Sequence, residues 1–420
     1  MKAVDPVKLT QELVRIPSVT GNEDAASDFV FGFLKERLGA SNVRKQGVKG
    51  HGCNVIARST KETKGSILLC SHIDTVSPGD ESSWTVPPFF GRMVGDKLYG
   101  RGSLDAKSNL AAIMAALIRC SEENVPVVLG ATVDEEGICS GAYRRVRHPW
   151  ARDCLSAVAA EPGCDLNYPS FSKDYPTVWH NGAGRVELEL SGGFQALRSA
   201  VTVLSKRFPD NFQPTSFDCV PEEPEQGLLV ESPVGTAHAA LTKPEDNVIL
   251  NALLNASSET ASGMKSIADS KDAGLSLPKN VTLFFGKADG TGTVKLDYYP
   301  AKEEDVLELF KRETDGLDVS VNAVPRDTPY LKAWNTPAGV ARHMTRNAFL
   351  ESYGKLPKLV SAPSPSDANV LSTELGVPTI VFGTKGCGVH SPDEWVSVQS
   401  IKETTEACFR VCRGNHLNNP

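Results

Sequence analysis

Four short runs of apolar residues without polar alternation constrain the fold of this chain most strongly. They cover residues 67–70, 127–133, 155–160 and 379–382. Strands of a parallel sheet have this pattern because helices cover both of their faces. Helical periodicity is present at 22–38, 108–118 and 401–412, and Asp5 with Pro6 predicts the start of a first helix. Together these signals predict an α/β fold with a mostly parallel sheet covered by helices.

The stretch from 182 to 325 has a different pattern. Residues 186–190 alternate between apolar and polar, as a half-solvated strand does, and proline and acidic residues are concentrated in 221–233. A single core rarely serves more than about 250–300 residues, so a chain of 420 residues predicts two domains. We expect a first domain made of 1–181 and 326–420, and an inserted α+β domain at 182–325. A helix at 196–206 and the acidic loop would enlarge the inserted domain.

Composition argues against two classes of partner. Lys and Arg number 44 against 51 Asp and Glu, which gives a net charge of -7, and we find no dense basic run of the kind that binds nucleic acid. No window approaches the roughly 20 apolar residues of a membrane helix, and residues 1–13 carry charges where a signal peptide needs an apolar stretch. We therefore expect a cytoplasmic protein.

The ten cysteines include no Cys-x-x-Cys pair, so mostly buried thiols are expected.

Side chains of the types that can bind metals follow each apolar run or precede the helix at 108–118. They are His72, Asp105, Glu135, Glu136, Glu161 and His390. Ligands of open α/β sheets bind beyond the carboxyl ends of the strands, so we expect these groups along one edge. Imidazole with carboxylate favours zinc. Because this set exceeds what one catalytic zinc uses, we expect two divalent ions bridged by one carboxylate.

This arrangement predicts hydrolysis. A water molecule between two metal ions loses a proton readily, and it can attack a carbonyl carbon when a nearby unligated carboxylate accepts that proton. In the adjacent pair Glu135 and Glu136, one carboxylate can bind a metal and the other can accept the proton. Each residue alone has a simpler explanation: Glu pairs are commonly solvated, Asp105 could cap the helix that follows, and His72 could be a core histidine. The joint occurrence of all of them at strand ends favours the metal centre.

The same segments resemble a known family, the two-zinc aminoacylases and carboxypeptidases. This family includes acetylornithine deacetylase, succinyl-diaminopimelate desuccinylase, hydrolases of lysine biosynthesis and several dipeptidases. The resemblance rests on residues 71–76 (SHIDTV), 98–107 (LYGRGSLDAK), 134–137 (DEEG), 160–162 (AEP) and 390–395 (HSPDEW). It covers nearly all of 1–181 and 336–412, and it implies a zinc-peptidase-like catalytic domain.

The resemblance assigns roles to individual residues. Asp105 would bridge the two metals, His72 and Glu161 would complete one site, and Glu136 and His390 would complete the other. Glu135 would be the general base. Asp74 would hold the His72 imidazole in the tautomer that presents a lone pair to the metal. The metals would be Zn²⁺, with Co²⁺ or Mn²⁺ as alternatives.

The inserted domain also resembles the family's lid domain. Residues 235–240 (GTAHAA), followed by Asn247, are similar to the lid motif whose histidine, here His238, reaches the active site of a partner subunit and helps stabilise the oxyanion. The resemblance therefore implies a homodimer formed through the lid, with Asn247 as a substrate contact. Tyr299 stands where the family has a substrate-binding arginine, so the substrate stays open. Ser366 and Asp367 are further candidates for substrate binding; a turn leading into a helix is the alternative for both.

We conclude that the sequence predicts a metal-dependent amidohydrolase that removes an N-acyl group from an amino acid, as acetylornithine deacetylase does. A dipeptidase or carboxypeptidase with the same metal centre is the first alternative, and an inactive binding protein on this fold is the second. The sequence has no Gly-x-Ser-x-Gly elbow and no phosphate loop, so serine hydrolases and nucleotide enzymes are not supported.

Overall fold

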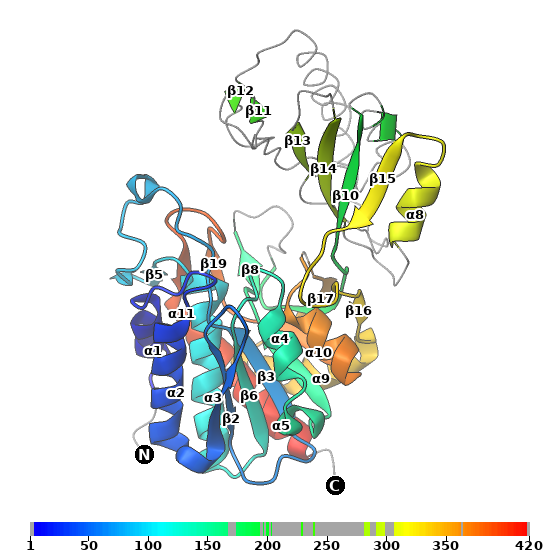
Figure 1. The fold of residues 1–420 in the computed structure, drawn as a ribbon. Coiled ribbons are helices and arrows are strands. Elements are labelled where there is room, and N and C mark those ends of the chain that lie inside the picture. The colour runs from blue at the N-terminus through cyan, green and yellow to red at the C-terminus, as the bar shows by residue number, and fades with distance from the viewer. Residues whose placement is uncertain are drawn as a thin grey trace. The chain divides into compact units, whose positions relative to one another are not determined.

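The computed structural model describes residues 4–166, 174–193, 306–362 and 364–417, four short strand segments between 228 and 298, and single residues at 196, 199, 200 and 203. It divides into two compact units (Figure 1). The first contains Met1–Gly182 and Trp334–Pro420, and the second contains Ala183–Ala333.

A nine-stranded sheet forms the centre of the first unit. Its strands are β1 Val43–Gly47, β2 Cys53–Arg58, β3 Ile67–His72, β6 Val127–Thr132, β7 Ser156–Ala160, β9 Thr177–Gly182, β16 Trp334–Asn335, β17 Lys358–Ser361 and β18 Thr379–Phe382. Their order is β1-β2-β6-β3-β7-β18-β9-β16, with β17 beside β9. The four central strands β6, β3, β7 and β18 are parallel, and they are the four apolar runs of the sequence. The predicted α/β class is confirmed, with antiparallel strands added at both edges.

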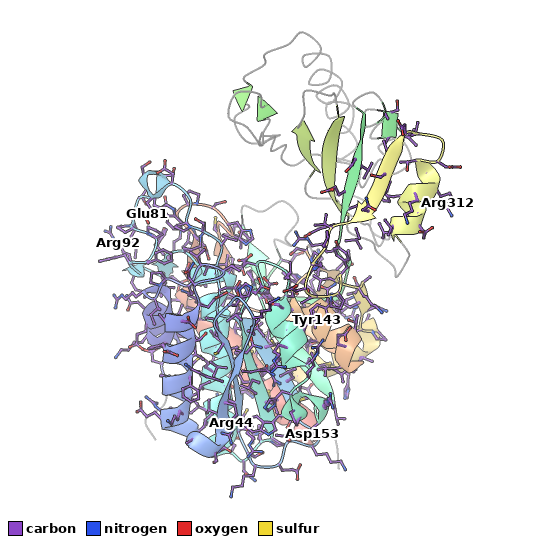
Figure 2. All side chains as sticks on the ribbon, viewed as in Figure 1. Arg44, Glu81, Arg92, Tyr143, Asp153 and Arg312 are labelled. Atoms are coloured by element: carbon purple, nitrogen blue, oxygen red, sulfur yellow. The ribbon has the colours of Figure 1, made fainter. Side chains whose placement is uncertain are left out.

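Helices cover both faces of this sheet. They include α1 Pro6–Val14, α2 Asp24–Leu38, α3 Ser108–Glu122, α4 Ser140–Arg145, α5 Pro149–Arg152, α9 Ala338–Tyr353, α10 Asp367–Leu375 and α11 Val398–Leu417. Leu129 of β6 packs in the apolar core with residues of α3, whereas a Cβ atom at Gly130 would lie 2.6 Å from Arg145 of α4. Because successive residues of a strand point to opposite faces, α3 and α4 lie on opposite sides of β6 (Figure 1). Side chains fill the intervening space, and charged groups such as Arg92 project outward (Figure 2).

Two helix ends follow their sequence signals directly. Asp5 accepts a hydrogen bond from the amide of Val7 at 2.9 Å, and Pro6 is the first residue of α1. α2 ends before Gly39, whose φ of 82° lies in the left-handed region that glycine adopts without steric cost.

A small second sheet connects segments that are distant in sequence. Its strands pair in the order β4 Arg92–Val94, β5 Lys97–Tyr99, β20 Trp395–Ser397, β19 Lys385–Cys387 and β8 Cys164–Asp165. Trp395 pairs with Tyr99 on one side and with Cys387 on the other. The segment before residue 105 is thereby fixed to the segment that contains residue 390.

The second unit contains a four-stranded antiparallel sheet in the order β13 Val281–Phe285, β14 Thr291–Tyr298, β10 Val186–Gly193 and β15 Val319–Ala323. Helix α8, Val306–Glu313, packs against β15. Leu188 and Leu190 of β10 are buried, whereas their neighbours Glu187 and Glu189 are half-buried. The alternation of apolar and polar residues predicts this pattern. The described part of this unit, Ala183–Ala333, therefore contains both helix and antiparallel strands.

Several expectations for the second unit lie outside the described residues. His238 is in the short strand β12, His238–Ala239, which pairs with β11, Leu228–Leu229, but its side chain is not described. Asn247, Tyr299 and most of the acidic loop also lie outside. Of the expected helix 196–206, only residues 196, 199, 200 and 203 are described, and all four are helical. Within the described part of the chain, we find no helix with the length and apolarity needed to cross a membrane.

Candidate metal centre

Five candidate ligands from distant parts of the sequence meet at the carboxyl edge of the central sheet. His72 is the last residue of β3, Glu136 follows β6, Glu161 follows β7, Asp105 precedes α3, and His390 lies between β19 and β20. His72 Nε2 lies 3.1 Å from Asp105 Oδ1 and 3.4 Å from Glu161 Oε2. His390 Nε2 lies 3.3 Å from Asp105 Oδ2 and 3.0 Å from Glu136 Oε2.

Asp105 divides these ligands into two groups. One is His72, Asp105 and Glu161, and the other is Asp105, Glu136 and His390; within each group the ligand atoms lie within 4.8 Å of one another. Glu135 forms a third such group with His72 and Glu136. The two oxygens of Asp105 face different histidines, Oδ1 towards His72 and Oδ2 towards His390. A carboxylate placed in this way can contribute one oxygen to each of two cations.

The residues present fit a pair of divalent cations. Oxygen and imidazole nitrogen donors suit zinc and the neighbouring transition metals. Glu161 Oε1 is buried and has no hydrogen-bond partner, and a buried carboxylate oxygen without a partner is costly. Burial raises the pKa of Glu161 to about 7, with Asp105 and Asp367 adding to the increase and His72 opposing it. A cation would supply the positive charge that these acidic groups lack.

Without a cation, protonated histidines supply the positive charge next to these carboxylates. Burial acts to lower the pKa of His72, but Glu161 and Asp105 outweigh it and raise this pKa well above its ordinary value. Burial likewise acts to lower the pKa of His390, and Asp105 and Glu136 raise it to about 10. Burial acts to raise the pKa of Asp105, yet hydrogen bonds from His390 and His72 lower it. A metal ion must therefore displace protons from both rings.

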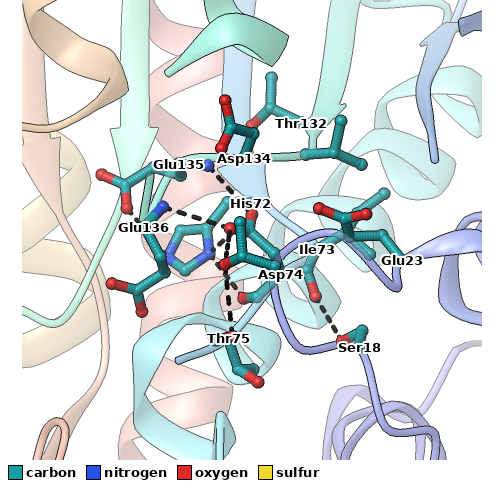
Figure 3. Close-up of polar contacts among 12 residues, drawn as sticks. Ser18, Glu23, His72, Ile73, Asp74, Thr75, Thr132, Asp134, Glu135 and Glu136 are labelled. Atoms are coloured by element: carbon teal, nitrogen blue, oxygen red, sulfur yellow. Dashed lines mark hydrogen bonds and ion pairs between the residues drawn. The ribbon is translucent and has the colours of Figure 1, made fainter. Parts of the chain in front are cut away.

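Asp74 holds both a ligand and the turn that carries the candidate base (Figure 3). His72 Nδ1 lies 2.9 Å from the backbone oxygen of Asp74 and 3.6 Å from its carboxylate, so Nδ1 donates and Nε2 is left to present its lone pair. The Asp74 carboxylate accepts hydrogen bonds from the amides of Glu135 at 3.1 Å and Glu136 at 3.2 Å, and from Thr20 Oγ1 at 2.9 Å. The orienting contact expected from the Asp74 side chain is thus shared with its main chain.

Glu135 lies beside the two ligand groups. Its Oε2 atom is 4.0 Å from His72 Nε2, and its side chain is 11% exposed. Burial raises the pKa of Glu135 well above its ordinary value; Glu161 and Glu136 add to this increase and His72 opposes it. A carboxylate in this environment has a high proton affinity, which a general base requires.

The turn that carries Asp105 is fixed by Glu394, for which the sequence indicated no individual role. Glu394 is fully buried. Its Oε2 accepts from Arg101 Nη1 at 2.7 Å and the Gly102 amide at 3.0 Å, and its Oε1 accepts from the amides of Leu104 at 2.8 Å and Asp105 at 3.0 Å. Burial raises the pKa of Glu394, and Arg101 opposes this increase. The only sequence signal for this contact is the place of Glu394 in the motif 390–395.

Ser366 and Asp367 lie at the start of α10. Ser366 caps the helix by accepting from the Ala368 amide at 3.2 Å, and Asn369 Oδ1 accepts from the Ser366 amide at 2.9 Å. Asp367 is fully buried and accepts from Thr132 Oγ1 at 2.6 Å. Both positions agree with the turn into a helix that was the alternative to substrate binding.

Comparison with known proteins gives the chain's relatives. A succinyl-diaminopimelate desuccinylase from Rhodospirillum centenum is 26% identical over 421 residues, which cover 97% of this chain and 96% of that protein. Succinyl-diaminopimelate desuccinylase 1 from Ruegeria sp. is 41% identical over 145 residues, 33% of this chain and 36% of that protein. The second match is therefore higher in identity but local, and the first spans nearly the whole length.

A solved structure and a family description agree with these relatives. The M20 family metallo-carboxypeptidase of Sulfolobus solfataricus aligns with a TM-score of 0.69 at 16% identity, covering 99% of this chain and 100% of that chain. At this identity the likeness shows the fold. The description of peptidase family M20/M25/M40 matches residues 68–413, most of the chain. The resemblance drawn from the motifs is confirmed, and this chain belongs to peptidase family M20/M25/M40, whose members are metal-dependent hydrolases of amide bonds.

Proposed function

We propose that this protein is a two-zinc amidohydrolase that removes an N-acyl group from an amino acid. The observation that carries the proposal is the pair of ligand groups that share Asp105, with Glu135 beside them. Relatives named succinyl-diaminopimelate desuccinylase support an acylated amino acid as substrate. His72 and Glu161 would hold one cation, Glu136 and His390 would hold the other, and Asp105 would hold both.

The protein's own groups supply positioning and proton transfer. When bound, two divalent cations would polarise the scissile carbonyl and increase the acidity of a water molecule. Glu135 accepts the proton of the attacking water and donates it to the leaving amine, for which its raised pKa is suited. Asp74 keeps Glu135 in reach by binding its amide, and it also orients His72.

The test is a comparison of substrates with one isosteric variant. Zinc-loaded protein is assayed against N-succinyl, N-acetyl and dipeptide substrates that share the same amino acids, with release of free amine as the readout. Glu135→Gln should keep two equivalents of metal and lose about 10²- to 10⁴-fold in turnover, the usual contribution of general base catalysis. Wild-type turnover in Glu135→Gln would contradict the role of Glu135, and no turnover of any N-acyl substrate would contradict the substrate class. Reconstitution with Co²⁺ or Mn²⁺ in parallel compares the metals.

A dipeptidase or carboxypeptidase activity is the second candidate. The full-length alignment with the metallo-carboxypeptidase of Sulfolobus solfataricus favours it. The same substrate panel separates the deacylase from the dipeptidase, because a dipeptide carries an aminoacyl group with a free α-amine where the first candidate's substrate carries an acyl group without an amine. Preferred turnover of dipeptides over the matched N-acetyl amino acids would establish the second candidate.

We further propose that residues 182–325 form a lid through which two copies associate, with His238 serving the partner's site and Asn247 contacting substrate. The proposal rests on the motif at 235–240. Co-expression of His238→Ala with Glu135→Gln tests it, because a mixed dimer has one site with both an intact Glu135 and an intact His238 from the partner. We expect activity in the mixed dimer and little in either homodimer. Full activity of His238→Ala alone would contradict the shared site.

A further inference from the structure

A second buried carboxylate network reaches the turn of Glu135 through Asp134. His51 lies in the turn between β1 and β2, with its Nδ1 atom 3.1 Å from Glu23 Oε1 and its Nε2 atom 3.5 Å from Asp134 Oδ1. Glu23 is fully buried and Asp134 is 2% exposed. Glu23 also accepts hydrogen bonds from the amides of Gly21 at 2.9 Å and Gly52 at 3.1 Å. The His51 ring therefore connects two buried acidic groups that are far apart in sequence.

Asp134 has a conformation that its surroundings must maintain. It directly precedes Glu135, and its φ of 61° lies in the left-handed region, which few residues other than glycine, asparagine and aspartate adopt. Its Oδ2 atom accepts from the amide and the hydroxyl of Ser140, which leaves Oδ1 facing His51. A Cβ atom at Gly137 would lie 2.1 Å from Asp134 Oδ1, so the glycine is needed for this carboxylate to take its place.

Glu135 and Glu136 are held at their amides by the same carboxylate, but their side chains differ in their contacts. Glu136 is fixed by His390, which lies 3.0 Å from its carboxylate, and by the Asp74 carboxylate at its amide. Glu135 has the same Asp74 carboxylate at its amide, but its side chain has no comparable contact under 3.5 Å with the described groups of the centre. Figure 3 shows Asp134 directly beside Glu135 at this turn, so the backbone conformation of Asp134 influences the direction in which the Glu135 side chain leaves the chain.

We propose that His51, anchored by Glu23, is a positioning residue for Glu135 and acts through Asp134. This inference rests on the proposed role of Glu135 as the proton acceptor. His51 lies outside the ligand groups, so it sets the geometry of proton transfer without holding a metal.

The two ring nitrogens allow matched substitutions. The side-chain amide nitrogen of Asn occupies the place of Nδ1, and that of Gln occupies the place of Nε2. His51→Asn therefore keeps the contact with Glu23 and loses the contact with Asp134, whereas His51→Gln keeps the contact with Asp134. We expect His51→Asn to lower kcat about 10- to 100-fold, the size usual for groups that orient the residues of a metal site, and His51→Gln to restore most of this loss. His343→Asn, an exposed position on α9, is the control for the substitution itself.

A double-mutant cycle with Glu135→Gln identifies the residue on which His51 acts. His51→Asn should lower kcat with little change in KM and with two equivalents of zinc retained, and the same change should have almost no further effect in Glu135→Gln. A destabilised protein without this specific role would lose activity equally in both backgrounds. If His51→Asn does not fold, Asp134→Asn interrupts the same contact from the other side and should give the same pattern.

The possible outcomes distinguish the role of His51 from the proposed function. Wild-type kcat in His51→Asn, loss of zinc, or an equal fold-loss in both backgrounds would overturn the role of His51 and leave the proposed function intact. Wild-type turnover in Glu135→Gln would contradict the role of Glu135 and, with it, the inference about His51; absence of turnover of every N-acyl substrate by the wild type would contradict the proposed function. A loss of kcat that is rescued by His51→Gln and absent in the Glu135→Gln background would support both.

Discussion

Replacing Glu394 by glutamine tests how the turn of Asp105 is held. The glutamine oxygen can still accept the two amide hydrogen bonds that Oε1 accepts in the wild type. The NH₂ group, however, would face Arg101 and Gly102, which now donate hydrogen bonds to Oε2. Two lost hydrogen bonds to a charged group, at about 1.5–3 kcal/mol each, amount to roughly 3–6 kcal/mol. Removal of one partner from a buried ion pair costs about 3–5 kcal/mol by an independent measure. We therefore expect the free energy of unfolding to fall by about 3–5 kcal/mol in the metal-free variant.

Two measurements check this value. Urea unfolding of metal-free wild type and variant gives the change in free energy, and hydrogen exchange of the segment 100–107 reports whether the amides bound by Glu394 open locally. Asp393→Asn is the matched control, because the neighbouring Asp393 accepts from Thr85 near the surface and its loss should cost less than about 1 kcal/mol. A variant within about 1 kcal/mol of wild type, with unchanged exchange in this segment, would refute the reasoning.

Three further predictions concern the ligands and the start of α10. Asp105→Ala should lose both equivalents of zinc and His390→Ala chiefly one, as measured by metal analysis after gel filtration; two equivalents in Asp105→Ala would exclude a shared ligand. Although burial acts to lower it, the pKa of His390 is raised to about 10 from 6.5 by Asp105 and Glu136. Near neutral pH the metal-free ring thus keeps a proton that a cation must displace, so zinc affinity should rise as the pH approaches about 10. Calorimetry in buffers of different ionisation heat should count this proton, and fewer should be released by His390→Ala; equal release would contradict the assignment. Ser366→Ala should lower the free energy of unfolding by about 1 kcal/mol through the lost cap without raising KM, whereas a raised KM at unchanged stability would restore its role in substrate binding.

The parallel strands at the centre of the sheet could be predicted because a strand that is buried on both faces has an uninterrupted run of apolar residues in its sequence. β2 lacked this signal since Asn54 interrupts it. Asn54 is fully buried, donates to the Gly141 oxygen at 2.8 Å and accepts from the Val133 amide at 3.1 Å. The strands of the small sheet contain only two or three residues each, which is too short for a periodic pattern. Their pairing depends on tertiary contacts that no local pattern reports.

The candidate ligands could be predicted for a related reason. Parallel strands end at one edge, so polar residues after His72, Thr132 and Ala160 had to collect there. The groups that support the ligands could not be predicted in this way. Glu394 acts on a turn almost 300 residues earlier, since it is 289 residues from Asp105, and His51 contacts Glu23 across 28 residues. A buried acidic residue looks the same in sequence as an exposed one when its partners are distant.

The pairing of β7 with β18 has a consequence for synthesis of the chain. One strand of this pair precedes residues 183–333 and the other follows them. Ribosomes add about 5–20 residues per second, so His390 emerges roughly 15 to 65 seconds after His72. During most of that interval the nascent chain lacks one proposed ligand, His390, and β7 lacks its neighbour β18. The ligand group that contains His390 can therefore be completed only after residues 183–333 have been synthesised.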